Sequence, residues 1–126
     1  MNNDVNNNQQ KKYLKPYIEA RPWGNFEQFT KNESSTVKII TVNPGGELSL
    51  QYHAKRSEFW KVLSGQPTIT IDDAVVTAHA GDEFFAPAGA KHRIQAGDTP
   101  AAILEVAFGD FDENDITRLE DKYGRA

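Results

Sequence analysis

The feature that most constrains the fold is an alternation of short β-rich runs with turn signals, which continues from residue 25 to residue 108. Glycine, proline and aspartate separate most of the runs, as in Asn43-Pro44-Gly45-Gly46 and Ala80-Gly81-Asp82. Many short strands at this spacing indicate a β-sandwich or a β-barrel. No long amphipathic stretch lies between them, which disfavours βαβ units and a parallel sheet. The predicted strands are Asn25–Phe29, Val37–Val42, Leu48–His53, Glu58–Leu63, Thr68–Ile71, Ala74–Thr77, Glu83–Phe85, His92–Gln95 and Ile103–Phe108.

The two ends of the chain differ from this β-rich centre. Residues 1–12 (MNNDVNNNQQKK) contain only two apolar residues, too few to offset the entropy of ordering the segment. We therefore expect a disordered tail, followed by one domain over residues 13–126.

Near the other end, the acidic run Asp112–Asp115 precedes apolar residues at helical spacing, and Gly124 follows as a stop signal. This pattern predicts one short C-terminal helix.

Composition narrows the function classes. A chain of 126 residues has room for one ordinary domain. It has no cysteine, which excludes disulfides, thiol nucleophiles and cysteine-ligated metal sites. A net charge of -4 argues against nucleic acid as a partner, because binding to phosphates needs a basic surface. No apolar run approaches the ~20 residues that cross a bilayer, and no apolar signal segment opens the chain. We therefore expect a cytoplasmic protein with no membrane contact.

Two of the three histidines fall where strands can bring them together. Side chains alternate faces along a strand, so Gln51 and His53 share one face of their strand. Glu58 begins the next strand and His92 begins a later one. Two imidazoles, one carboxylate and one amide oxygen could then converge, and the alternative is a pair of hydrogen-bonded core histidines. His79 lies near a turn outside this pattern and is expected to be an ordinary surface residue.

The glycine spacing around these residues follows a two-part pattern. The first part runs from Gly45 through Gln51, His53 and Glu58 to Gly65, and the second from Gly81 through Pro87 and Gly89 to His92. Glycines supply turn conformations that pleated strands cannot adopt. The pattern resembles the signature of the cupin family. The resemblance implies an all-β fold, the cupin double-stranded β-helix or jelly-roll barrel, here with the short C-terminal helix, and a metal held by Gln51, His53, Glu58 and His92.

Five longer motifs extend the resemblance from Arg21 to Arg125: Arg21-Pro22-Trp23-Gly24, Leu48–His53, Arg56–Trp60, Pro87–Arg93 and Asp115–Arg125. They resemble the type II mannose-6-phosphate isomerases, in particular the cupin domain that ends a bifunctional isomerase and mannose-1-phosphate guanylyltransferase. This implies a metal-dependent isomerase that interconverts mannose 6-phosphate and fructose 6-phosphate. It also implies one divalent ion per chain (zinc first, then manganese, cobalt, nickel or iron) and a homodimer. The glycine-rich nucleotide loop of guanylyltransferases is missing, so the chain is not expected to make GDP-mannose by itself.

Residues near the expected ligands supply further candidates. Basic side chains there form either a solvated rim or a cationic mouth that attracts a sugar phosphate. The candidate substrate-binding residues are Arg56, Arg93 and Tyr52, and the candidate catalytic residues are Arg56, Lys91 and Glu105. Arg93 is expected to point away from the histidine next to it. Glu105 lies in the middle of a strand and is either exposed or a buried acid that can transfer a proton.

Two other function classes stay open. One is a non-catalytic cupin that binds a sugar phosphate or a nucleotide sugar. The other is a cupin dioxygenase, since two histidines and one carboxylate can bind ferrous iron with open positions. Gln51 and the motifs outside the barrel argue against the dioxygenase. Turnover with added metals separates the isomerase from the binding cupin, and oxygen uptake identifies the dioxygenase.

Overall fold

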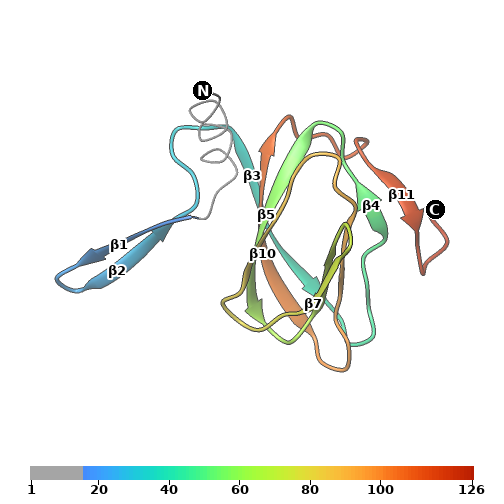
Figure 1. The fold of residues 1–126 in the computed structure, drawn as a ribbon, viewed down its shortest axis with the longest axis horizontal. Coiled ribbons are helices and arrows are strands. Elements are labelled where there is room, and N and C mark those ends of the chain that lie inside the picture. Colours follow the sequence, from blue (N-terminus) through green and yellow to red (C-terminus); the bar gives the residue numbers. More distant parts are fainter. Residues whose placement is uncertain (1–15) are drawn as a thin grey trace.

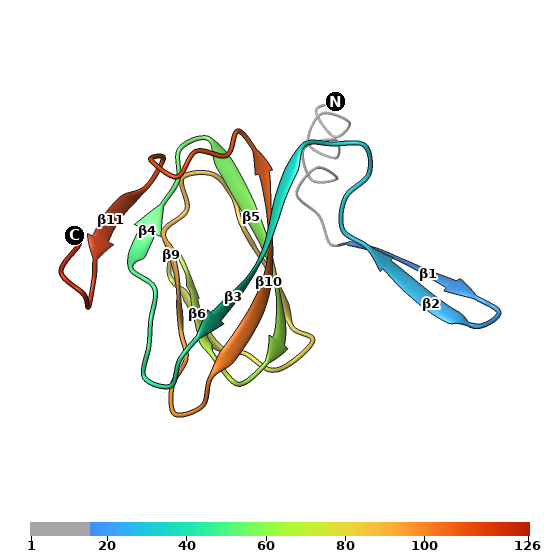
Figure 2. The ribbon, with the colours of Figure 1, turned by 180° about the vertical axis from the view of Figure 1, so that it is seen from behind.

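Two antiparallel sheets face each other in this computed structural model, which describes residues 16–126 (Figure 1 and Figure 2). Strands from distant parts of the chain are neighbours in both sheets, as in a jelly-roll barrel. In sheet order, the first comprises β3 (Ser35–Val42), β10 (Ala101–Gly109), β5 (Arg56–Ser64) and β8 (Glu83–Ala86). The second comprises β11 (Thr117–Glu120), β4 (Leu50–Tyr52), β9 (His92–Gln95), β6 (Thr68–Ile71) and β7 (Ala74–Thr77). The expected disordered tail, residues 1–12, lies outside the described residues.

The inward-facing residues of both sheets fill the interior. Along β9, His92 and Ile94 are buried while the residues between and after them are partly exposed, which is the alternation of a half-buried strand. Along β10, Ile103 and Glu105 are buried in the same way. The apolar core cluster consists of Val42, Trp60, Val62, Ile69, Ala78, Ile94, Ala96, Ala101 and Ile103. Both polar residues on these inner faces, His92 and Glu105, therefore enter the barrel beside apolar neighbours.

One glycine allows a close backbone approach near the end of the barrel. Gly109 ends β10 with a φ of +98°, which favours glycine, and a Cβ added there would lie 2.8 Å from Lys55 O. A larger residue would push the end of β10 away from the loop that follows β4. That loop joins His53 to β5, so the glycine keeps two parts of the candidate site together.

All nine predicted strand regions are confirmed, with ends that differ by a few residues, and the described chain has two further strands. One is β1 (Tyr17–Arg21), which pairs with β2 (Gly24–Gln28) in a two-stranded hairpin. The hairpin projects from the barrel (Figure 1). Just after β2, Phe29 packs against Phe59 of β5 with ring centroids 5.7 Å apart, which covers the outer face of that strand.

The predicted C-terminal helix is wrong. Thr117–Glu120 forms β11, which pairs antiparallel with β4, and residues 16–126 contain no helix. The acidic run makes a turn instead, in which Asp115 N donates to Asp112 O at 2.9 Å. The Asp115 carboxylate accepts hydrogen bonds from the loop after β4 rather than capping a helix of its own. A short isolated helix is only marginally stable in water. Pairing of Thr117–Glu120 with the edge of β4 is therefore the more stable arrangement.

The described part of the chain has no helix that is long and apolar enough to cross a membrane.

Candidate functional site

Three of the four predicted ligands meet inside the barrel. His53 follows β4, Glu58 lies on β5 and His92 begins β9, so both sheets contribute. His53 Nε2 lies 3.3 Å from Glu58 Oε2, and His92 Nε2 lies 3.2 Å from Glu58 Oε1. One ligand atom from each residue lies within 4.8 Å of the others, and all three side chains are buried. We call these three residues the His–Glu–His cluster.

Strand pairing accounts for this meeting. Gln51 on β4 is the register partner of His92 on β9, which brings the two halves of the glycine pattern together. The pairing of β5 with β10 sets Trp60 opposite Glu105. Glu58 and Trp60 are two residues apart on β5 and share its inner face. The cluster and Glu105 therefore lie in the same part of the interior.

Backbone carbonyls fix the orientation of both imidazoles. His53 Nδ1 lies 2.6 Å from Asp115 O, and His92 Nδ1 lies 2.9 Å from Ala90 O. A carbonyl oxygen can only accept, so each Nδ1 carries the proton and donates it. In a neutral ring of this tautomer, the lone pair is on Nε2, which faces Glu58. Histidines that ligate metals in proteins are held in this way.

Three electron-rich atoms thus face one another in a buried space. Burial alone raises the pKa of Glu58, but contacts with His92 and His53 lower it to about 2, so the carboxylate is ionised at neutral pH. Burial lowers the pKa of His53, which favours its neutral form. His92 Nε2 makes no hydrogen bond within the described residues. Two imidazole nitrogens and a carboxylate form a donor set that fits divalent metals such as zinc, iron and cobalt.

Gln51 reaches the edge of the cluster. Its Nε2 lies 3.4 Å from His53 Nε2, while its Oε1 accepts a hydrogen bond from Ser49 Oγ at 2.6 Å. A half-turn of the side-chain amide would exchange these atoms and aim the oxygen at the cluster. Gln51 is therefore within reach of the position that the sequence predicts for a fourth ligand.

Arg56 is buried against the cluster and, two residues before Glu58 on β5, shares its face of the strand. Its Nε donates to Glu58 Oε2 at 3.1 Å, and its Nη2 lies 3.3 Å from His53 Nε2. Its Nη1 donates to Asp112 O at 3.1 Å, and its guanidinium lies 4.3 Å from the centre of the Phe111 ring. Arg56 thus supplies a fixed positive charge beside Glu58 and joins the cluster to the segment after β10.

A second buried carboxylate lies beside the cluster. Glu105 is 4% exposed, and its Oε1 accepts a hydrogen bond from Trp60 Nε1 at 3.1 Å. Burial raises the pKa of Glu105 to about 7, and the charge of Glu58 acts in the same direction. Of the two alternatives for Glu105, the structure has the buried acid. A carboxyl group with this pKa can exchange a proton near neutral pH.

The remaining predicted residues lie away from the cluster. Arg93 points out of the barrel, as expected, where its Nη1 lies 3.4 and 3.6 Å from two carboxylates. Lys91 is exposed in the turn before β9. Tyr52 is half-buried and alternates with Gln51 along β4, so the two occupy opposite faces. His79 is exposed, in agreement with its expected surface position.

Sequence reasoning missed Asp115. Its backbone oxygen accepts the hydrogen bond from His53, which precedes it by 62 residues. No motif spacing connects these positions, and the acidic run that contains Asp115 has the composition of a helix cap. The only signal in the sequence is that Asp115 begins the last of the five motifs.

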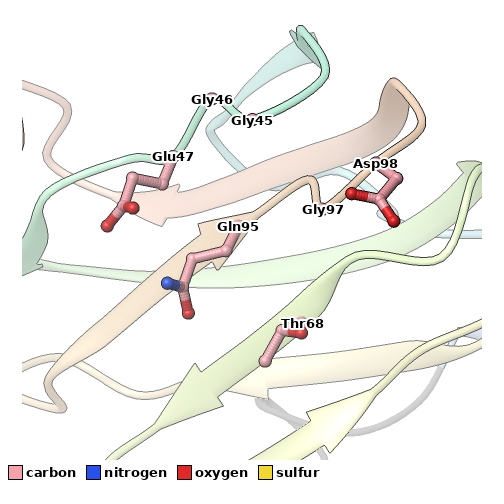
Figure 3. Close-up of a pocket in the computed structure, with 7 residues that line it drawn as sticks. All are labelled: Gly45, Gly46, Glu47, Thr68, Gln95, Gly97 and Asp98. Carbon is pink, nitrogen blue, oxygen red and sulfur yellow. The ribbon is translucent and has the colours of Figure 1, made fainter.

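A separate depression of about 320 Å³ lies beside Gln95, the last residue of β9 (Figure 3). Glu47, Gln95 and Asp98 give it a polar lining. The complete lining is Gly45, Gly46, Glu47, Thr68, Gln95, Gly97 and Asp98. None of these residues belongs to the His–Glu–His cluster, so the depression is a different feature from the candidate metal centre.

Curated relatives match most of this chain. The alginate biosynthesis protein AlgA of Pseudomonas aeruginosa is 41% identical over 107 residues, which cover 83% of this chain and 22% of AlgA. The mannose-1-phosphate guanylyltransferase ManC of Salmonella typhimurium is 38% identical over 107 residues, which cover 83% of this chain and 22% of ManC. The chain therefore spans less than a quarter of the length of these relatives.

Solved structures have the same fold. Oxalate decarboxylase from Bacillus subtilis has a TM-score of 0.63 and 28% identity, over 69% of this chain and 24% of that one. A cupin 2 domain-containing protein from Halorhodospira halophila has a TM-score of 0.61 and 23% identity, over 71% of this chain and 60% of that one. These likenesses confirm the predicted cupin barrel.

The family assignment follows from a match that covers nearly the whole chain. The family model described as "Mannose-6-phosphate isomerase C-terminal" matches residues 6–121. The matched range contains the His–Glu–His cluster, Gln51 and Glu105, and it agrees with the resemblance that the sequence motifs carry. The chain therefore belongs to the mannose-6-phosphate isomerase C-terminal family of cupin domains.

Proposed function

We propose that this chain is a metal-dependent isomerase that interconverts mannose 6-phosphate and fructose 6-phosphate. The observation that carries the proposal is the His–Glu–His cluster with a second buried carboxylate, Glu105, beside it. The cluster can hold a divalent ion, and Glu105 can move a proton. An isomerisation between an aldose and a ketose uses both abilities, and membership of the family supports this choice of substrate.

The reaction moves a proton between neighbouring carbons. In the open-chain aldose, a base removes the proton on C2, and the electrons of that bond form a C1–C2 double bond while the carbonyl electrons move to the C1 oxygen to give an enediolate, whose C1 oxygen then takes up a proton to give an enediol. A proton is then added to C1, and loss of the O2 proton leaves the ketone at C2. The phosphate takes no part in these steps, so its role is to anchor the far end of the substrate and orient the reacting carbons.

We assign the ion to His53, Glu58 and His92, with Gln51 as the fourth ligand. We expect zinc, with manganese, cobalt, nickel and iron as alternatives that the same donors accept. When bound, a divalent ion polarises the substrate carbonyl and stabilises negative charge on the sugar oxygens.

We assign proton transfer to Glu105. Its pKa of about 7 lies close to the working pH, where a general base and its conjugate acid are both available. The indole N–H of Trp60 holds one carboxylate oxygen at 3.1 Å. Arg56 adds a fixed positive charge next to the cluster, which stabilises the negative charge that develops on the way to the enediolate. Lys91, in the turn just before His92, is the alternative base.

The test is turnover by the purified chain. Protein freed of metal with a chelator is loaded separately with zinc, manganese and cobalt, and formation of fructose 6-phosphate from mannose 6-phosphate is followed at neutral pH. We expect activity with at least one metal, loss of activity on renewed chelation, and a much lower kcat/KM for unphosphorylated mannose. No turnover with any of these metals, despite bound metal and an intact fold, would refute the isomerase.

A non-catalytic cupin that binds a sugar phosphate or a nucleotide sugar is the second candidate. It is favoured by the short span of the match, since this chain corresponds to 22% of the guanylyltransferase ManC. Calorimetric binding of mannose 6-phosphate or GDP-mannose without turnover would support this candidate. The dioxygenase is a weaker third candidate, which oxygen uptake by the iron-loaded chain would reveal.

We further propose that the chain acts in the cytoplasm as a homodimer. The biosynthetic relatives support the cytoplasmic location, and the analogy with other cupins supports the dimer. The projecting hairpin exposes Tyr17, Ile18 and Trp23, which a second copy could cover.

A further inference from the structure

One residue of the segment between β10 and β11 binds three consecutive residues of the candidate metal centre. Asp115 O accepts a hydrogen bond from His53 Nδ1 at 2.6 Å. The Asp115 carboxylate accepts two more, from Ala54 N to Oδ1 at 2.8 Å and from Lys55 N to Oδ2 at 2.9 Å. The backbone from His53 to Lys55 is therefore held by Asp115 through both its main chain and its side chain.

These contacts determine what His53 can do. The carbonyl bond keeps the proton on Nδ1, so the lone pair is on Nε2, which lies 3.3 Å from Glu58 Oε2. The two carboxylate bonds fix the peptide groups that immediately follow His53, and so limit how the ring can shift. The same hydrogen bonds from Ala54 and Lys55 lower the pKa of Asp115, so its side chain accepts both bonds as a carboxylate at neutral pH.

The rest of the segment supports the same region. Arg56 Nη1 donates to Asp112 O at 3.1 Å, and its guanidinium lies over the Phe111 ring. On the other side of Asp115, β11 pairs with β4 so that Arg118 is opposite Gln51. Residues 111–118 therefore contact His53 directly, Glu58 through Arg56, and Gln51 through strand pairing. The apolar core cluster contains no residue of this segment.

We propose that Asp115 is a positioning residue that holds His53 ready to bind the metal ion and thereby sets metal affinity and coordination geometry. The inference rests on the proposed metal site and adds a residue to it from a different part of the chain. Hydrogen-bonding partners behind a metal-ligating histidine typically change affinity by about 10–100-fold when they are removed. Asp115→Ala keeps the backbone carbonyl but releases Ala54 and Lys55, so His53 should lose its fixed position.

The experiment uses the full chain, freed of metal and titrated with Co²⁺. Binding is measured by calorimetry, and coordination geometry is measured by the visible absorption of the bound cobalt. We expect Asp115→Ala to weaken Co²⁺ binding about 10–100-fold and to change the cobalt spectrum. The Co²⁺ affinity of Asp115→Asn should lie between those of Asp115→Ala and the wild type, because its amide oxygen can still accept one of the two backbone hydrogen bonds.

Two controls separate positioning from a general loss of structure. Asp121→Ala removes another acid of the C-terminal region, whose carboxylate binds Arg125 instead, and it should leave Co²⁺ binding unchanged. The urea midpoint of each metal-free variant reports stability separately. If Asp115→Ala does not fold, the comparison rests on Asp115→Asn.

The outcomes distinguish this inference from the isomerase. An Asp115→Ala variant with wild-type affinity and cobalt spectrum would overturn the inference, as would a wild type that binds no cobalt. A wild type that binds cobalt but does not isomerise the sugar phosphate would refute the proposed function alone. The inference would then stand on the change in metal binding.

Discussion

Replacing His92 with alanine should abolish the response of the protein's stability to metal. His92 Nε2 is buried, faces Glu58 at 3.2 Å and makes no hydrogen bond within the described residues. Of the cluster atoms, His92 Nε2 is therefore the one whose burial a bound ion should stabilise most. The variant loses one ligand, while the barrel core remains.

The size of the effect follows from linkage. An ion that binds only the folded chain, at 100 times its dissociation constant, stabilises it by about 2.7 kcal/mol. The entropy of unfolding is about 2.1 cal/mol/K per residue, or about 0.23 kcal/mol/K over residues 16–126. Wild-type Tm should therefore rise by about 12 °C when zinc is added to metal-free protein. His92→Ala should show a shift near zero.

The substitution also has a cost in the metal-free protein. It removes the hydrogen bond from Nδ1 to Ala90 O and the contact with the Trp60 ring, whose centroid lies 5.3 Å from that of His92. We expect the loss of these contacts to cost about 2–4 kcal/mol, which lowers the starting Tm and is measured separately from the Tm shift on adding zinc.

The assay is differential scanning calorimetry with chelator and then with zinc, together with elemental analysis of the protein before chelation. His79→Ala is the matched control, because His79 is exposed and lies outside the cluster. It should keep one ion per chain and the full Tm shift. If His92→Ala retains stoichiometric metal and the wild-type shift, the assignment of the metal centre is wrong.

Three further predictions concern the second carboxylate, the hairpin contact and the assembly. Glu105→Gln should lower kcat at least about 100-fold with unchanged zinc content. Equal kcat in this variant and the wild type would show that another group is the base. The pKa of Glu27 is lowered by a hydrogen-bonding contact with Glu83 and by the hydrogen bond and charge of Lys61, against the effect of burial. The contact with Lys61 therefore stabilises the fold fully at pH values above about 4.5, the pKa of Glu27 in the unfolded chain. This stabilisation decreases as pH falls below that value. In urea titrations, Lys61→Met should lower the free energy of unfolding by under about 1 kcal/mol at pH 7 and by less at pH 3. An equal loss at the two pH values would contradict this role of Lys61. Sedimentation equilibrium should give twice the chain mass of 14.1 kDa, and a monomer at micromolar concentration would contradict the dimer.

The candidate ligands were predictable because strand alternation brings their side chains together and because their spacing resembles the cupin signature, which implies a metal. Gln51 and His53 share a face in any extended strand, and the glycine spacing fixes where Glu58 and His92 enter their strands. Their convergence still required the pairing of β4 with β9, which sets Gln51 opposite His92. The buried state of Glu105 was open in the sequence, since a mid-strand acid can face either side of a sheet.

The C-terminal region shows why local patterns can mislead. Asp112–Asp115 has the composition of a helix start, but hydrogen bonds between Asp115 and the loop after β4 compete with capping. The free edge of β4 then offers backbone partners to Thr117–Glu120. β1 was missed for a related reason, because Tyr17–Arg21 shows no clear alternation and pairs only with β2.

The sequence by itself determined the all-β class and most of the strands, and its resemblance to the cupin signature implied the barrel and the candidate metal ligands. These depend on neighbours within a few residues, through alternation, turn glycines and motif spacing. Tertiary structure decided that Arg56 is buried, that Glu105 meets Trp60, and that Asp115 fixes the tautomer of His53 from 62 residues away. Such contacts join segments whose separation along the chain carries no periodic signal. Their energy comes from burial and hydrogen bonding that exist only after the two sheets have closed on each other.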